Sequence, residues 1–125
     1  MNISRGFLVI GALYLLVGLA LGMHMGASGD HTLSPVHAHI NLLGFTLMTL
    51  FGLAYRLIPA LNTGALALAH FWLHQIGTLA LLVALYLLMS GTIPEATIGP
   101  FMPIGEGLVA LGVLAWLANI IRATR

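Results

Sequence analysis

The segment S34-PVHAHINLLGFTLMTLFGLAYRLI-P59 determines the class of fold. It has no Asp, Glu, Lys or Arg between Pro35 and Tyr55, and a helix crosses a bilayer with about 20 such residues. Three further apolar segments of similar length accompany it. We predict four transmembrane helices, at residues 7–25, 35–57, 65–90 and 103–121.

The composition excludes an ordinary soluble domain. Charged residues make up 6% of the 125 residues, hydrophobic residues make up 60%, and the mean hydropathy is +1.07. Soluble domains carry about 25% charged residues. We therefore predict an all-α integral membrane bundle of four helices, with residues 1–125 as a single domain. The net charge of +1 gives no indication of nucleic-acid binding, and the absence of cysteine excludes disulfides and covalently attached haem.

The charges that flank the predicted helices indicate the topology. Basic residues occur only at the N-terminus, in the second connection and at the C-terminus: Arg5, Arg56, Arg122 and Arg125. Asp30 and Glu95 occur in the other two connections. By the positive-inside rule, both termini are expected in the cytoplasm. The chain is then a multi-pass protein of a bacterial inner membrane, with the lipid bilayer as its first partner.

Two histidines stand at the start of the second apolar segment. We expect Ser34 to cap this helix and Pro35 to occupy its first turn. His37 and His39 are two residues apart, so their rings are separated by about 200° around the helix axis. They are therefore not expected to bind one metal ion together. Either they serve two sites on opposite flanks of the helix, or one is a ligand and the other is structural.

A second pair, His70 and His74, has a different spacing. Residues four apart share one face of a helix, with side chains about 6 Å apart. The pair can therefore chelate one ion, or it can hydrogen-bond between helices together with Gln75. Counting about 1.5 Å per residue, His74 is expected roughly 18–20 Å below the level of the outer pair. We thus treat His70 and His74 as a separate inner site.

The remaining ionisable residues within or near the spans are His24, His31 and Glu106. His24 lies between two methionines, a ligand set that suits soft copper, although methionines in membrane helices usually pack. Glu106 is the only acid within a predicted span, where it can pair with a histidine or carry a proton.

Three glycines recur at four-residue spacing in the first helix: Gly18, Gly22 and Gly26. Small residues at this spacing let helix backbones approach closely in lipid, where the hydrophobic effect does not drive helices together. We expect this face of the first helix to pack against a neighbour.

The run VHAHINLLGF at residues 36–45, followed by FGLAYRLIP at residues 51–59, resembles the haem–copper oxidase superfamily, which includes the nitric oxide reductases. In the catalytic subunit of that family, a late helix carries a His-x-His near its outer end. Its two rings ligate two different haems on opposite sides of the helix. The resemblance implies that His37 and His39 are ligands of haem iron, with a noncovalently bound haem b as the cofactor.

The same resemblance implies an assembly. The family's subunit has twelve helices in three pseudo-equivalent sets of four, and the His-x-His lies on the second helix of its set, as it does here. A homotrimer of this chain is therefore expected to look like a symmetrical version of that subunit. Each of its three haem sites, near the outer surface, would take His37 from one protomer and His39 from the next.

Departures from the family limit the expected activity. The His-Pro and His-His motifs of the family's copper site are missing, as is its crosslinking tyrosine motif. Neither oxygen reduction nor nitric oxide reduction is therefore expected. Iron with two histidine ligands has no open position, which favours electron transfer, or haem and redox sensing, with an electron-transfer protein as partner.

Two other functions remain open. The chain can be a membrane protein that binds copper or zinc, through the outer histidines or through His70 and His74. It can also be a non-catalytic accessory subunit of a respiratory complex, whose histidines only hydrogen-bond and pack.

Overall fold

The predicted fold class is confirmed: the computed structural model of residues 1–125 is all-helical, with four helices long and apolar enough to span a membrane. Three of them are single α-helices: α1 (Ile3–Ser28), α4 (Ala65–Met89) and α6 (Met102–Ala123). The second is divided into α2 (Ser34–His39), the π-helix η1 (Ile40–Thr46) and α3 (Leu47–Leu57). Three short helical elements occupy the connections: η2 (Pro59–Asn62), α5 (Glu95–Ile98) and η3 (Gly99–Phe101).

The ends of α1 extend beyond the predicted segment because both ends are capped. The Asn2 side chain accepts a hydrogen bond from the backbone N–H of Arg5 at 2.9 Å, which satisfies one of the free donors of the first turn. Gly29 follows the last turn with φ = 71°, a left-handed conformation that glycine adopts without strain.

The prediction that Ser34 caps the second helix is wrong. Ser34 is itself the first residue of α2, it follows Leu33, and no side chain caps this end. The Ser34 hydroxyl instead approaches the sulfur of Met25 at 3.9 Å. The hydroxyl thus contacts the end of α1, and Pro35 lies in the first turn as expected.

The transmembrane helix predicted at residues 35–57 is confirmed as Ser34–Leu57, but residues Ile40–Thr46 within it form a π-helix, which the sequence did not indicate. A π-turn inserts an extra residue and disturbs the regular hydrogen bonding of the helix. Here the Leu43 carbonyl accepts a hydrogen bond from the His74 ring of α4 at 3.0 Å. A donor from another helix therefore supports the irregular turn, and no property of the 35–57 segment alone indicates it.

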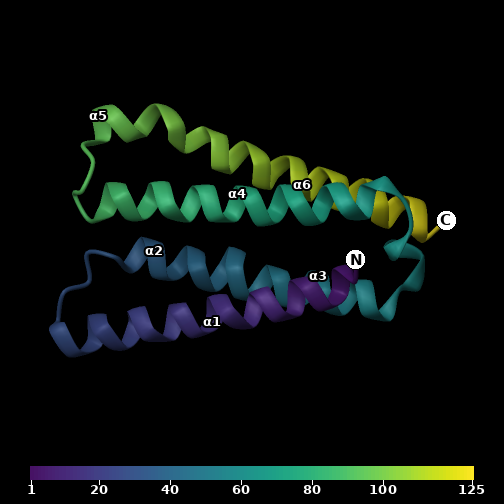
Figure 1. Cartoon of the computed structure of the whole chain (residues 1–125), viewed down its shortest axis with the longest axis horizontal. Helices are drawn as coiled ribbons and strands as arrows, with labels where there is room; N and C mark the ends of the chain where they lie inside the picture. The colour runs from purple at the N-terminus through teal and green to yellow at the C-terminus, as the bar shows by residue number, and fades with distance from the viewer.

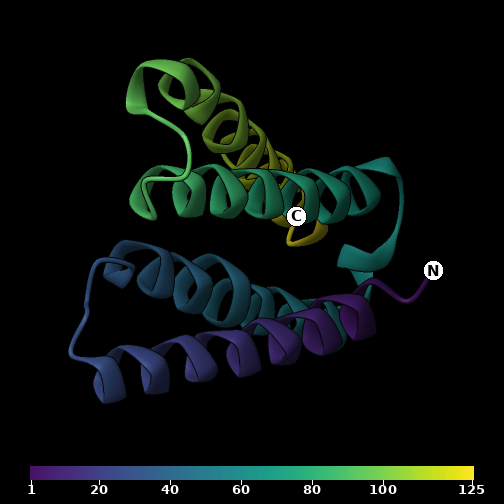
Figure 2. The same ribbon diagram turned by 60° about the vertical axis from the view of Figure 1, so that its left-hand side comes forward.

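The four spans form two antiparallel pairs (Figures 1 and 2). α1 packs against η1 and α3, α4 packs along α6, and the two pairs meet where α4 contacts α2 and α1. The two central spans are Ser34–Leu57 and α4. In the most apolar stretch of each, 33% of the residues are buried, against 17% in the spans that contain α1 and α6. The central spans therefore form most of the core, and α1 and α6 flank them.

Both termini and the α3–α4 connection lie at one end of the bundle (Figure 1). This end, which we call the arginine end, carries Arg5, Arg56, Arg122 and Arg125. The opposite end, which carries Asp30 and Glu95, is called the acidic end. The segregation of charge expected from the sequence is thus present in the fold.

Near the arginine end the spans converge on a cluster of aromatic rings. Phe7 of α1 lies edge-on to Phe71 of α4, with ring centroids 4.9 Å apart. Phe51 of α3 lies 5.1 Å from Trp116 of α6. Rings from all four spans therefore interlock, at separations typical of favourable aromatic pairs.

The connection between α3 and α4 is held by Arg122. Its guanidinium donates to the carbonyls of Ala60 at 3.1 Å and Thr63 at 2.8 Å, and to the Thr63 hydroxyl at 3.0 Å. Carbonyl oxygens of an irregular segment need such donors. The arginine thus fixes the last turns of α6 to this connection.

The pair α4–α6 depends on glycine. A methyl group built on Gly105 would lie 2.6 Å from the backbone nitrogen of Leu81, and one built on Gly77 would lie 2.7 Å from that of Val109. The two backbones therefore touch, as small residues allow in membranes.

Gly105→Ala is expected to lower the free energy of unfolding by about 1–3 kcal/mol, because the added methyl group meets rigid backbone. Gly107→Ala is the matched control, since nothing lies within 4 Å of a methyl group at that position. The measurement is unfolding of both variants by SDS titration in mixed micelles. Equal stability of the two variants would contradict the close approach of α4 and α6.

Candidate functional site

His37 lies between α2 and α1. Its Nε2 is 3.1 Å from the amide nitrogen of Asn41, one turn further along the helix. The ring rests against Gly22, where a methyl group would approach its Cε1 to 2.9 Å. Because the Asn41 amide nitrogen can only donate, His37 Nε2 accepts. The Nδ1 atom then carries the proton, and it is buried with no hydrogen-bond partner in the protein.

The glycine run of α1 therefore has a more specific role than general helix packing. Gly22 makes room for the ring of His37, and Gly18 makes room for the side chain of Asn41. Gly26 has nothing within 4 Å and faces no neighbour in the protomer. Asn41 was not predicted as a partner of His37. A polar residue four positions after a histidine in an apolar span nevertheless indicates such a contact, because residues four apart share a helix face.

His39 has a different environment on the same helix. Its Nδ1 lies 2.7 Å from the carbonyl oxygen of Pro35. A carbonyl can only accept, so Nδ1 carries the ring proton and the Nε2 lone pair is free. The side chain is partly exposed, and no other side chain of the protomer hydrogen-bonds to it. A histidine whose Nδ1–H is held by a backbone carbonyl is oriented as metal-ligating histidines are.

The two rings thus lie against different neighbours, in keeping with the spacing argument. His39 fits an axial ligand of haem iron as it stands, because its Nε2 is free and accessible. His37 fits only after its ring turns away from Asn41, because Asn41 occupies its Nε2 in this conformation. The orphaned Nδ1 of His37 indicates that the present position of the ring leaves a buried donor unsatisfied.

His70 lies in the core beside the aromatic cluster. It is fully buried, and its Nδ1 lies 3.0 Å from the hydroxyl oxygen of Tyr55. Tyr55 is also 3.5 Å from the amide nitrogen of Asn119. Asn119 in turn donates to the Leu61 carbonyl at 2.9 Å and accepts from Arg122 at 2.7 Å. A continuous chain of polar groups thus runs from Arg122 into the bundle.

His74 is fully buried as well, and its ring centroid lies 6.0 Å from that of His70. This separation equals the one expected from the spacing. The two rings are nevertheless held by different partners, since His74 donates to Leu43 and His70 contacts Tyr55. The Gln75 amide donates to the sulfur of Met48 at 3.5 Å, so it belongs to neither ring.

The contact with Leu43 shows that the ring of His74 lies closer to the level of His37 and His39 than predicted. Leu43 follows His39 by only four residues, about 6 Å of helix. The ring of His74 therefore lies nearer to the outer pair than the 18–20 Å that counting residues indicates. Counting failed because it ignores how far the side chain reaches between neighbouring helices. No cluster of three or more His, Cys, Asp or Glu side chains is present, so the two pairs do not merge into one metal site.

The other candidate residues are not brought together. Met25 is buried against Ser34, whereas Met23 is 74% exposed, so the two methionines that flank His24 point in different directions. His31 lies in the first connection, with Nδ1 3.1 Å from the Gly29 carbonyl. Glu106 is exposed on α6.

In the connection at the acidic end, Thr32 holds the carboxylate of Asp30. The hydroxyl of Thr32 donates to Asp30 at 2.6 Å, and its backbone N–H donates at 2.9 Å. These bonds favour the ionised form and lower the pKa of Asp30 below its ordinary value. Asp30 therefore keeps its negative charge further into the acidic range than an unperturbed carboxyl does.

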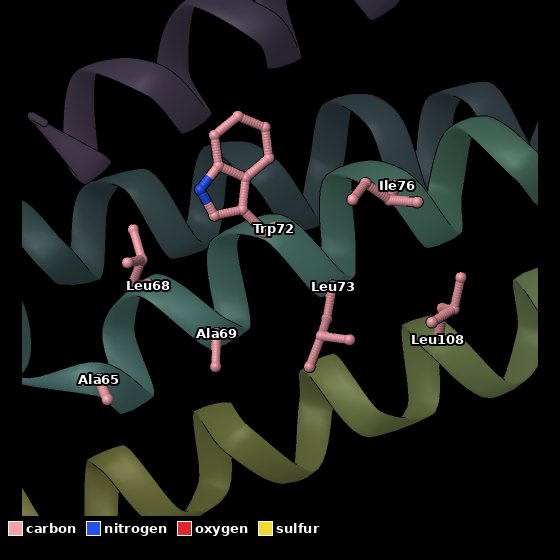
Figure 3. Close-up of a pocket in the computed structure, with 7 residues that line it drawn as sticks. All are labelled: Ala65, Leu68, Ala69, Trp72, Leu73, Ile76 and Leu108. Carbon is pink, nitrogen blue, oxygen red and sulfur yellow. The ribbon is translucent and has the colours of Figure 1, made fainter.

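Two apolar grooves lie on the surface of the bundle. One, of about 380 Å³, is bounded by α4 and Leu108 of α6, and Figure 3 shows Trp72 and Ile76 beside it. The other, of about 570 Å³, lies between α1 and α4, with Val36 and Ile40 at its base. Neither groove is lined by a histidine, cysteine, aspartate or glutamate, and both resemble lipid-facing surface.

No protein-family model, no curated protein and no solved structure matches this chain. The candidate site therefore rests on the geometry of the histidines themselves.

Gly22→Ala is expected to displace the His37 ring from α1, because the added methyl group overlaps its Cε1. Gly26→Ala, one turn away, is the control, since it adds a methyl group to open space. The imidazole ¹³C–¹H signals of His37 in lipid nanodiscs provide the measurement. A His37 signal that shifts no more in Gly22→Ala than in Gly26→Ala would show that the ring does not lie on Gly22.

Proposed function

We propose that this chain is a small membrane cytochrome that binds haem b through His37 and His39 of neighbouring protomers. The observation that supports it best is the state of His39. The Pro35 carbonyl orients its ring, and its Nε2 lone pair is free on a partly exposed flank of α2. A ligand oriented in this way, whose Nε2 has no partner inside its own protomer, suits a site that a second copy completes.

The second ligand of the proposed site is His37. Its ring is held by Asn41 and accommodated by Gly22, and its Nδ1–H is unsatisfied. Turning the ring toward the flank of α2 would release Nε2 for iron and would free the Asn41 amide. We propose that Asn41 and Gly22 hold His37 in the unliganded protein and allow this rotation.

The proposed haem sites require a homotrimer. A homotrimer brings His37 of one protomer to His39 of the next, in three equivalent sites. Haem iron with two histidine ligands supplies reversible one-electron oxidation and reduction without an open position for a gas. The function is therefore electron transfer, or haem and redox sensing, with an electron-transfer protein as a possible partner. The arginine end faces the cytoplasm of a bacterium by the positive-inside rule.

A visible spectrum of the purified protein, before and after reconstitution with haem b, tests the cofactor. We expect a Soret band and the spectrum of low-spin haem. His37→Ala and His39→Ala should each abolish this spectrum or convert it to high spin, because each removes an axial ligand. His31→Ala, in an exposed connection, is the control and should leave the spectrum unchanged.

Several outcomes would overturn the proposal. A protein that stays colourless after reconstitution does not bind haem. A colourless protein that contains copper or zinc by elemental analysis would support the metal-binding function, and one that co-purifies with a respiratory complex would support an accessory subunit. Loss of the spectrum only in His70→Ala or His74→Ala would move the ligands to the inner pair.

Mixing subunits tests whether two protomers share a site. In trimers assembled from His37→Ala and His39→Ala chains at equal amounts, roughly a quarter of the shared sites regain both ligands. We expect low-spin haem to reappear in this mixture, although each variant alone lacks it. A site within one protomer can never recover both ligands in this way, so a mixture without low-spin haem would exclude the shared site.

A further inference from the structure

The inner histidines form part of a hydrogen-bonded chain whose direction is fixed from one end. Arg122 carries only donors, so its contact at 2.7 Å identifies the partner atom of Asn119 as the amide oxygen. The amide nitrogen of Asn119 is then the atom 3.5 Å from the Tyr55 hydroxyl. Because this nitrogen can only donate, Tyr55 accepts there and keeps its own proton for another acceptor.

The proton of Tyr55 has one acceptor within reach, the Nδ1 atom of His70 at 3.0 Å. His70 therefore accepts at Nδ1, and a neutral imidazole that accepts at Nδ1 carries its proton on Nε2. This Nε2–H group is buried and has no hydrogen-bond partner in the protein. The chain thus ends in an unsatisfied donor.

The tautomer of His74 is fixed independently, from the second span. The Leu43 carbonyl can only accept, so the His74 Nε2 at 3.0 Å carries the proton. Its Nδ1 is then a lone-pair acceptor, and this atom is also buried without a hydrogen-bond partner in the protein. One ring of the inner pair therefore presents a donor and the other presents an acceptor.

A molecule that both accepts and donates satisfies the two atoms at once. The ring centroids lie 6.0 Å apart, so the two unpartnered nitrogens belong to neighbouring rings of the same buried region. Buried polar atoms of this kind are normally bonded to protein or to ordered water. We propose that His70 and His74 bind one water molecule between them.

The same pattern disfavours a metal ion at this pair. A metal needs a lone pair on His70 Nε2, which would move the ring proton to Nδ1. Tyr55 would then face a donor on His70 and another on Asn119, and its own hydroxyl proton would lose its acceptor. Burying a hydroxyl without an acceptor is unfavourable. Water requires no such rearrangement.

Thr78 shows why the histidines, in particular, need this ligand. Its hydroxyl oxygen, one turn beyond His74, is also buried without a partner. A threonine hydroxyl in a helix can rotate to the carbonyl four residues earlier, and so satisfy itself. The nitrogen atoms of an imidazole are fixed in the ring, and each ring here is already held by a bond at its other nitrogen.

The site lies wholly inside one protomer, and both histidines are fully buried there. It is therefore independent of the proposed trimer and of the outer histidines. The result is a directional chain from Arg122 through Asn119, Tyr55 and His70 to the bound water, and from there to His74 and the π-helix.

Solid-state NMR of ¹⁵N-histidine-labelled full-length protein in lipid bilayers tests this proposal without any variant. We expect both His70 and His74 as the Nε2–H tautomer, with magnetisation transfer from water to both rings. His70→Gln and His74→Gln assign the signals. An Nδ1–H tautomer at either ring, or rings that receive no magnetisation from water, would overturn the proposal.

Two additions distinguish the water site from its rivals. Tyr55→Phe removes the donor to His70 Nδ1 and should shift that resonance, whereas Tyr86→Phe, on the exposed surface of α4, should not. Equal responses to the two variants would contradict the chain. Added zinc should leave both rings unchanged, and a zinc-dependent shift of both would establish a metal site instead. The haem spectrum is expected to be the same in Tyr55→Phe, which separates this result from that of the proposed function.

Discussion

The hydrogen bond from His74 to the Leu43 carbonyl joins the two halves of this protein. In lipid a backbone carbonyl outside the regular helical pattern has no water to bond to, so it requires a donor from the protein. The histidine supplies such a donor to a carbonyl of the π-helix in the second span. In return, the carbonyl fixes the orientation of the His74 ring, and with it the packing of α4 against the helix that carries His37 and His39.

The polar groups of the core are concentrated toward the arginine end. Arg122 remains at the surface and donates to the α3–α4 connection, and through Asn119 and Tyr55 its influence reaches the buried His70. Each bond restricts the roles that the next group can take, because an arginine cannot accept and a carbonyl cannot donate. A bundle with so few charged residues thus obtains specific side-chain orientations from a short sequence of directional bonds.

The sequence was sufficient to predict the number of spans and the segregation of charge, because both depend on composition over about 20 residues. It also predicted the 6.0 Å separation of His70 and His74, which follows from helix geometry alone. The π-helix at Ile40–Thr46 and the contact of Asn119 with Tyr55 were beyond it. Both depend on groups distant in the chain, and a single sequence does not show which helices are neighbours. The prediction that Ser34 caps the second helix failed for a similar reason, since its hydroxyl contacts Met25 of the preceding helix.

The two histidine pairs show how spacing and surroundings together determine what a histidine can bind. The inner rings share a face of α4, but a bond at one nitrogen of each leaves complementary unpartnered atoms, a donor on His70 and an acceptor on His74. The outer rings lie against different neighbours, and the bond from His39 Nδ1 to the Pro35 carbonyl leaves the Nε2 lone pair of a partly exposed ring free. A lone pair of this kind is suited to a metal, whereas a buried donor and a buried acceptor on neighbouring rings are suited to water. The chemistry of each pair is therefore determined less by the presence of two imidazoles than by which nitrogen of each ring the rest of the fold has already engaged.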